Sequence, residues 1–134
     1  MMSLYLFPLF ILGLSPLSVE AAMSTFTAPF GDVYDSGGAT KNYGNNEVVD
    51  YEIDCGVSKV VIMLFTQFSF QNTVPCKDYI SIYDGSEEGA LLYSGCSYST
   101  TSSQFTFLSQ TSKAYIKYVT DGSTTAAGFT LNYR

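Results

Sequence analysis

The sequence has 134 residues, with 12 acidic and 6 basic side chains, no His, no Trp and three Cys. A net charge of −6 lacks the basic surface that binding to phosphate backbones or anionic membranes requires, which excludes nucleic acid as a partner. Without His, the chain also excludes Ser-His-Asp triads, Cys-His pairs and His-ligated zinc. Length and composition therefore predict one acidic globular domain without imidazole chemistry.

The first predicted element is a secretory signal peptide over residues 1–21. Its apolar run over residues 4–17 is interrupted by two prolines and is too short for a membrane span. Val19 and Ala21 place small side chains before a predicted cleavage that follows Ala21. The alternative is an N-terminal anchor or a buried segment, which the prolines and the small-residue boundary disfavour. The sequence therefore predicts a secreted, extracellular domain over residues 22–134.

The rest of the chain shows no long helical periodicity, and its apolar residues alternate with polar ones in short runs between polar clusters. Such alternation is typical of half-buried antiparallel strands. Inward-facing stripes are predicted from Val49, Tyr51 and Ile53; Ile80 and Ile82; Phe105 and Phe107; Ala114, Ile116 and Tyr118; and Phe129, Leu131 and Tyr133. The run Val60–Phe65 is apolar at every position, which predicts a strand covered on both faces. This pattern predicts an all-β fold, a sandwich of two antiparallel sheets.

Several motifs follow one another in the order and spacing of a known extracellular family. They are Phe65-x-x-Phe68-x-Phe70-Gln71, Cys76-Lys77-Asp78-Tyr79-Ile80-x-Ile82-Tyr83-Asp84-Gly85, Cys96, Thr120-Asp121-x-Ser123 and Gly128-Phe129-x-x-x-Tyr133. Over about residues 31–133 the chain resembles the CUB domain. The resemblance implies a two-sheet jelly-roll sandwich that acts as a binding module and not as an enzyme. It also implies an architecture comparable to that of the spermadhesins, which are isolated CUB domains.

Three cysteines leave one without a partner in the chain if the protein folds in an oxidising compartment. The resemblance pairs Cys76 with Cys96, the family's second bridge, across the Asp84-Gly85 turn. A loop of this size stabilises a fold by about 3 kcal/mol. Cys55 remains, because the family's first bridge has no earlier Cys in this sequence. We expect either a half-buried free thiol that has lost its partner or an intermolecular disulfide that forms a homodimer or joins another protein.

Calcium is the cofactor that the resemblance implies, because many CUB domains hold Ca²⁺ with one Glu and two Asp at one end of the sandwich. The two aspartates fall on Asp78 and Asp121, and the glutamate position holds Gln71. Gln71 offers only a neutral carbonyl oxygen, so the site keeps two of three negative charges. The alternative is that Asp78 and Asp121 cap loops by accepting backbone N–H bonds, as Asp commonly does in turns.

Tyrosines in or beside the predicted turns are candidates for a partner-binding surface, since Tyr combines a large rigid ring with a polar tip. They are Tyr34, Tyr43, Tyr83, Tyr93 and Tyr98. The alternative is that tyrosines at strand ends pack on the rim of the core. The expected partner is an extracellular protein or a carbohydrate, although carbohydrate stacking loses its best platform without Trp.

An enzyme is the competing class, because Asp35-Ser36-Gly37 superficially resembles the Asp-Ser/Thr-Gly segment of aspartic proteases. A dimer would pair two Asp35 carboxylates that share one proton. The CUB resemblance instead makes this segment a tight turn after the first strand. We therefore expect a secreted, non-enzymatic module that binds an extracellular protein or glycan. The remaining alternative is a fragment or splice form of a longer multi-domain extracellular protein.

Overall fold

The computed structural model describes residues 23–97 and 106–134, and all regular structure in them is β-strand. The strands are β1 (Met23–Phe26), β2 (Gly31–Tyr34), β3 (Val48–Asp54), β4 (Ile62–Ser69), β5 (Tyr79–Asp84), β6 (Leu91–Gly95), β7 (Thr106–Leu108), β8 (Lys113–Val119) and β9 (Gly128–Tyr133). A search of the described residues for a helix long and apolar enough to cross a membrane finds none. The predicted signal peptide over residues 1–21, together with Tyr98 and Phe105, lies outside the described residues.

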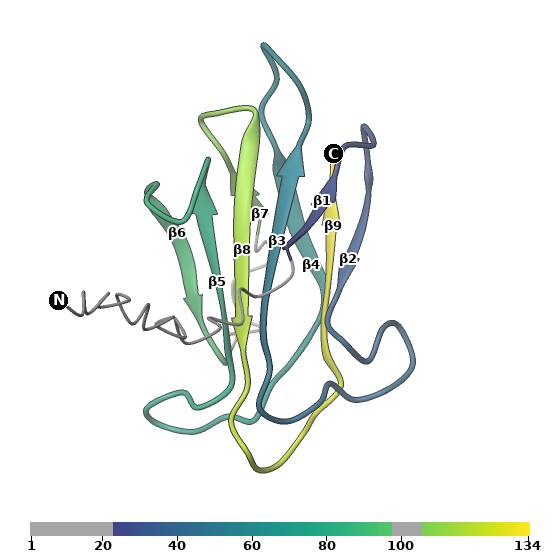
Figure 1. Cartoon of the computed structure of the whole chain (residues 1–134), viewed down its shortest axis with the longest axis vertical. Helices are drawn as coiled ribbons and strands as arrows, with labels where there is room; N and C mark the ends of the chain where they lie inside the picture. Colours follow the sequence, from purple (N-terminus) through teal and green to yellow (C-terminus); the bar gives the residue numbers. More distant parts are fainter. Residues whose placement is uncertain (1–22, 98–105) are drawn as a thin grey trace, which may run out of the picture.

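The strands of the described residues form two sheets that face each other (Figure 1). One sheet has the order β1-β3-β8-β5-β6 and the other has the order β2-β9-β4-β7. Neighbouring strands pair antiparallel, except that β1 runs parallel to β3 at the edge of the five-stranded sheet. The predicted all-β class and the two-sheet antiparallel sandwich are confirmed.

The core lies between the two sheets, because each strand turns alternate apolar side chains inward. Ile53, Ile82 and Ile116 of the five-stranded sheet are fully buried, as are Met63 and Leu131 of the four-stranded sheet. The predicted inward stripes of β3, β5, β8 and β9 all belong to this core or pack against it. The alternation of apolar and polar residues therefore predicts correctly which face of these four strands is buried.

The expectation that the run Val60–Phe65 is covered on both faces is wrong. Val61 and Met63 are fully buried, but Val60 is 45% exposed and Leu64 is 39% exposed. The reason is that β4 belongs to an outer layer: its inner face meets the core, and no described segment forms a layer on its outer face. The apolar outward positions of β4 therefore need an explanation other than the core of this chain.

The alternation pattern does not single out β1 or β6, both of which are edge strands. In β1 the contact with the core comes from Phe26, whose ring centroid lies 6.1 Å from that of Tyr51 and 6.2 Å from that of Tyr133. In β6 the pairing with β5 shifts between Ile82 and Tyr83. Short edge strands with a single core contact or an irregular register lack the periodicity that marks longer strands.

Candidate functional site

Three loops meet at one end of the sandwich, at the bottom of Figure 1, and we call this the loop end. They are residues 35–47 after β2, residues 70–78 after β4 and residues 120–127 after β8. A backbone hydrogen bond joins the first loop to the third, with the Asn46 N–H donating to the Asp121 carbonyl oxygen at 2.8 Å. Segments that are distant in the sequence therefore form one surface.

Asp78 is at the centre of the loop end. Its side chain is fully buried, and both carboxylate oxygens accept hydrogen bonds. The Asp121 N–H donates to Oδ1 at 2.8 Å, and the Tyr43 hydroxyl donates to Oδ2 at 2.7 Å. The Tyr43 oxygen in turn accepts a bond from the Gln71 N–H at 3.1 Å. The three residues that the resemblance assigns to a calcium site thus lie together, with Tyr43 between them.

Tyr43 belongs to the hydrophobic core, and its hydroxyl group reaches this cluster. It is 1% exposed, which corrects the expectation that it contributes to a partner-binding surface. Burial, followed by the hydrogen bond to Asp78, raises the pKa of the Tyr43 hydroxyl above its ordinary value. The hydroxyl therefore remains a donor to Asp78 throughout the physiological pH range. Its ring centroid lies 5.4 Å from that of Phe70 and 6.3 Å from that of Tyr118.

Gln71 leaves an unsatisfied acceptor beside this cluster. Its Oε1 is buried and accepts no hydrogen bond from the described part of the chain. A buried acceptor without a donor costs about 1–3 kcal/mol, so such atoms in folded proteins usually contact water or an ion. Asp78, Asp121 and Gln71 together offer only oxygen ligands, which hard cations such as Ca²⁺ prefer.

The charge of the cluster is lower than that of a site built from three carboxylates. Within residues 23–97 and 106–134, no group of three or more Asp, Glu, Cys or His side chains is close enough to hold a metal ion. The ion pairs found in these residues involve Lys113 or Lys117, so none of them neutralises Asp78 or Asp121. A cation at this site would need backbone carbonyl or water oxygens in addition to the two carboxylates and the amide.

Asp35 has a structural role beneath the first loop. It is 4% exposed, its Oδ1 accepts the Gly37 N–H at 2.8 Å and its Oδ2 accepts the Phe129 N–H at 2.7 Å. Burial raises the pKa of this carboxyl, and the backbone hydrogen bonds oppose that shift in part. The Asp35 carboxyl is buried, and both of its oxygens accept hydrogen bonds from backbone N–H groups of the same chain. It therefore cannot meet the carboxyl of a second copy. This placement corrects the aspartic protease alternative.

Glu47 is another acidic residue of the loop end, and no sequence pattern singles it out. Its Oε2 accepts bonds from the Ser36 hydroxyl at 2.6 Å and from the Tyr118 hydroxyl. Its N–H donates to Thr120 Oγ1 at 3.0 Å. These contacts fasten the first loop to β8 and use the carboxylate away from Asp78. Because the hydroxyl partners lie 11 and 71 residues away, no local motif could have revealed them.

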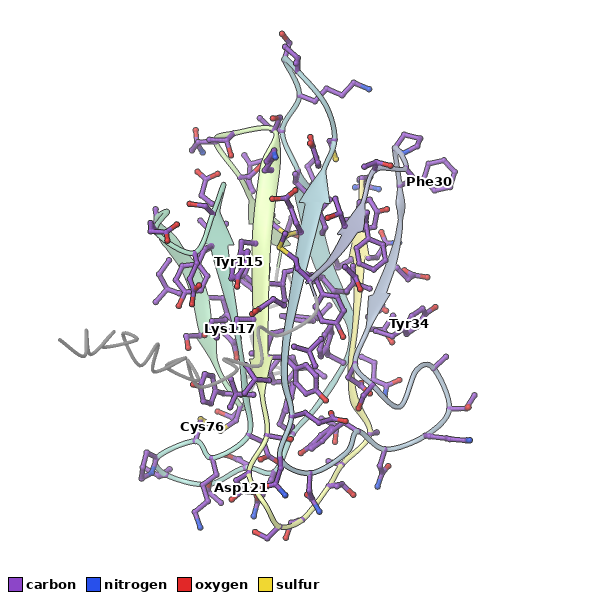
Figure 2. All side chains as sticks on the ribbon, in the orientation of Figure 1. Phe30, Tyr34, Cys76, Tyr115, Lys117 and Asp121 are labelled. Carbon is purple, nitrogen blue, oxygen red and sulfur yellow. A yellow bond between two sulfur atoms is a disulfide. The ribbon has the colours of Figure 1, made fainter. Side chains whose placement is uncertain are left out.

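The cysteines distinguish the two ends of the sandwich. The predicted bridge between Cys76 and Cys96 is confirmed, with Cα atoms 5.6 Å apart, and Figure 2 shows Cys76 at the same end as Asp121. Cys55 is a free, half-buried thiol at the opposite end, where its N–H donates to the Ser112 carbonyl oxygen at 2.9 Å. Partial burial raises the pKa of this thiol. A disulfide from Cys55 to another molecule stays a prediction.

Of the other predicted tyrosines, the three within the described residues do not share one surface, and Tyr98 lies outside those residues. Tyr34 lies on β2 at the edge of the four-stranded sheet, where its hydroxyl donates to Asp32 at 3.2 Å. Tyr83 lies on β5 and Tyr93 on β6, both in the five-stranded sheet. Tyr93 packs against the core cluster. This distribution favours rim packing over a single contact surface built from tyrosines.

Proteins of similar sequence agree with this fold. A model of the CUB domain family matches residues 23–133. Cubilin from Rattus norvegicus is 30% identical over 118 residues, which cover 87% of this chain and 3% of cubilin. Cubilin from Homo sapiens is 30% identical over 77% of this chain. The chain thus spans about 3% of the length of these curated relatives.

Solved structures agree as well. The CUB1-EGF-CUB2 domains of rat MASP-1 align with a TM-score of 0.70 at 21% identity, over 84% of this chain and 42% of that one. The MASP-1 CUB2 domain bound to Ca²⁺ aligns with a TM-score of 0.69 at 23% identity, over 83% of this chain and 96% of that one. At these identities the likeness shows the fold alone.

Proposed function

We propose that this chain, which belongs to the CUB domain family, is a non-catalytic extracellular binding module whose loop end uses Ca²⁺ to hold a basic group of a protein partner. The observation that carries the proposal is the fully buried Asp78 carboxylate beside Asp121 and the unsatisfied Gln71 Oε1. Burying a carboxylate is unfavourable unless hydrogen bonds and a counter-charge compensate for the lost water. A bound cation supplies the counter-charge that the ion pairs of the described residues do not.

Asp78 and Asp121 would supply two carboxylates and Gln71 an amide oxygen, with the remaining ligands from backbone carbonyls and water. Bound Ca²⁺ would supply the counter-charge for the buried Asp78 and fasten residues 70–78 to residues 120–127. The MASP-1 CUB2 domain bound to Ca²⁺ supports the choice of ion. Because Gln is neutral, we expect weak binding, with a dissociation constant of about 10⁻⁴ to 10⁻³ M.

A protein with a basic contact group is the favoured partner. The net charge of −6 attracts cationic surfaces, and complementary charge raises the rate of association. Carbohydrate binding has less support, because the chain has no Trp, Tyr43 is buried, and Tyr34 lies on a different sheet from Tyr83. The proposed mode is therefore a Lys or Arg side chain of a partner that meets Asp121, the partly exposed carboxylate of the site.

Calorimetric titration and thermal denaturation test the calcium step. We expect Ca²⁺ at about ten times its dissociation constant to raise the melting temperature by a few degrees, with a smaller effect of Mg²⁺. Asp121→Asn should remove the shift, and Asp84→Asn, a matched change at the opposite end, should retain it. If the wild-type protein shows neither heat nor a shift in melting temperature at about 10 mM Ca²⁺, the calcium step is wrong.

Gln71→Glu offers a gain-of-function test, because it restores the third carboxylate. We expect it to bind Ca²⁺ at least about tenfold more tightly than the wild type, since affinity rises with the charge of the ligands. The control is Gln110→Glu, which adds the same charge at an exposed position next to β7. Equal affinities of Gln71→Glu and the wild type would show that residue 71 is not a ligand. A Lys-rich peptide, titrated with Ca²⁺ and with EDTA, then tests the partner class.

A further inference from the structure

We infer that the outer face of the four-stranded sheet is a homodimer interface, in which an apolar strip packs against the same strip of a second copy. The apolar strip consists of Val60, Ile62, Leu64 and Leu108. Val60 is 45% exposed, Leu64 is 39% exposed and Leu108 is 48% exposed, and Ile62 is half-buried among them. This surface is separate from the loop end, so the inference goes beyond the proposed function.

The strip is continuous because of the strand pairing. Alternate residues of a strand point to the same face, which places Ile62 and Leu64 of β4 side by side on the outside of the sheet. Val60 lies two residues before β4 and is 45% exposed. In the antiparallel pair of β4 and β7, Ile62 lies opposite Leu108 and Leu64 lies opposite Thr106. Directly opposite Cβ atoms are about 4.5–5.5 Å apart, so the Leu108 side chain extends the strip onto β7. A small pocket opens on this face, lined by Ile62, Leu64, Thr106, Asn132 and Arg134.

The outward positions of neighbouring strands show how unusual the strip is. β3 turns Asp50, Glu52 and Asp54 outward on the other sheet, and β9 turns Thr130 and Asn132 outward beside β4. A strand with one solvated face normally alternates apolar residues inside with polar residues outside. Ile62 and Leu64 on β4, together with the exposed Val60 just before it, therefore indicate a face that is buried against another surface.

Charge favours a second copy as the occupant. The chain carries a net charge of −6, so two copies repel each other through most of their surface. On the outer face of the four-stranded sheet, the described strands and the residue after β9 present Asp32, which bonds Asn132, and Arg134 in the pocket lining. These two charges cancel. In a two-fold dimer, Arg134 of one copy can approach Asp32 of the other at the polar rim around the apolar centre.

The proposed contact follows the geometry of sheet packing. Sheets pack face to face about 10 Å apart with their apolar side chains interdigitated, as the two sheets of this chain already do. A second copy adds another such layer on the strip and leaves the loops of the loop end free. Cys55 follows β3, on the other sheet, so the dimer does not require an intermolecular disulfide.

Sedimentation equilibrium of the purified protein tests the inference, with Cys55→Ser in every sample to exclude disulfide-linked dimers. We expect a monomer–dimer equilibrium with a dissociation constant in about the micromolar range. Raising NaCl to about 0.5 M should preserve or strengthen the dimer, because salt screens the repulsion between two acidic chains. Leu64→Lys should raise the dissociation constant more than about tenfold, because it buries two unpaired charges in the interface.

The matched control is Leu91→Lys. Leu91 is 57% exposed on the edge strand β6 of the other sheet, so its substitution should leave the dissociation constant unchanged. Urea denaturation verifies that each variant is folded, and Leu108→Lys replaces Leu64→Lys if the latter is not. A wild-type protein that is monomeric at about 0.5 mM would overturn the inference. A folded strip variant that dimerises as tightly as the wild type would overturn it as well.

Discussion

The two ends of the sandwich are each organised by an aspartate, but the two aspartates are held in different ways. At the loop end, Asp78 is fully buried, and its partners Asp121 and Tyr43 lie 43 and 35 residues away. At the opposite end, Asp84 is partly exposed at the end of β5 and accepts three hydrogen bonds from the turn before β8. Water can replace the partners of Asp84 but not those of Asp78, so a lost partner costs more at the loop end.

The disulfide reinforces this difference. Cys76 and Cys96 are joined next to the loop end, whereas Cys55 at the opposite end is a free thiol. The loop end is therefore held by buried polar bonds and a covalent link, which is the rigidity that a binding site requires. The same substitution made at the two ends should consequently have unequal effects.

The largest difference should appear with glycine substitutions. Gly128 at the loop end and Gly56 at the opposite end have φ angles of +75° and +87°, but only a Cβ at Gly128 would overlap another group, the Asp35 carboxylate. Gly128→Ala should lower the free energy of unfolding by about 3–5 kcal/mol, because Asp35 must give up its backbone bonds. Gly56→Ala should cost about 1 kcal/mol, from backbone strain alone. Urea denaturation measures both, and similar losses would refute the difference between the ends.

A smaller difference should separate the two aspartates. Asp78→Ala leaves the Asp121 N–H and the Tyr43 hydroxyl without their acceptor in a buried site, which should cost about 3 kcal/mol. Asp84→Ala exposes its former donors to water and should cost about 1 kcal/mol. The comparison uses urea denaturation in EDTA, so that bound Ca²⁺ does not contribute. An equal or smaller loss for Asp78→Ala would mean that water reaches the loop end as easily as the opposite end.

Much of this fold could be predicted from the sequence, because the inward stripes of β3, β5, β8 and β9 each meet the opposite sheet. The run Val60–Phe65 predicts burial on both faces, and that prediction is wrong, because an apolar pattern alone does not show whether another layer of the chain covers a face. The structure places one face of β4 in the core and leaves the other outside.

The candidate site was only partly predictable. The family resemblance placed Gln71, Asp78 and Asp121 together, but the buried Tyr43 that joins them was expected on the surface. Its position depends on how residues 35–47 fold against two other loops, and no local periodicity encodes that arrangement. Long-range loop contacts are therefore the part of the site that sequence patterns cannot supply.

The smallest effect, and the one most specific to each end, is the dependence of stability on pH. Burial raises the pKa of Asp35 above its ordinary value of 3.8, so its contribution to stability is present at low pH and lost as pH rises through the raised pKa. For Asp84, burial raises the pKa, but hydrogen bonds from Gln110 and Thr111 lower it by more, so the pKa lies below its ordinary value. Its contribution is present above the ordinary pKa and lost as pH falls through the lowered one.

Urea denaturation from about pH 3 to pH 7 should therefore give opposite slopes for the two Asn variants. The loss of stability in Asp35→Asn, relative to the wild type, should shrink as pH rises, because the wild type ionises a buried carboxyl. The loss in Asp84→Asn should grow over the same range, because the wild type gains a carboxylate that accepts three hydrogen bonds. Parallel slopes would show that the two carboxyls experience the same environment, and the distinction between a buried and a solvated aspartate would fail at these two positions.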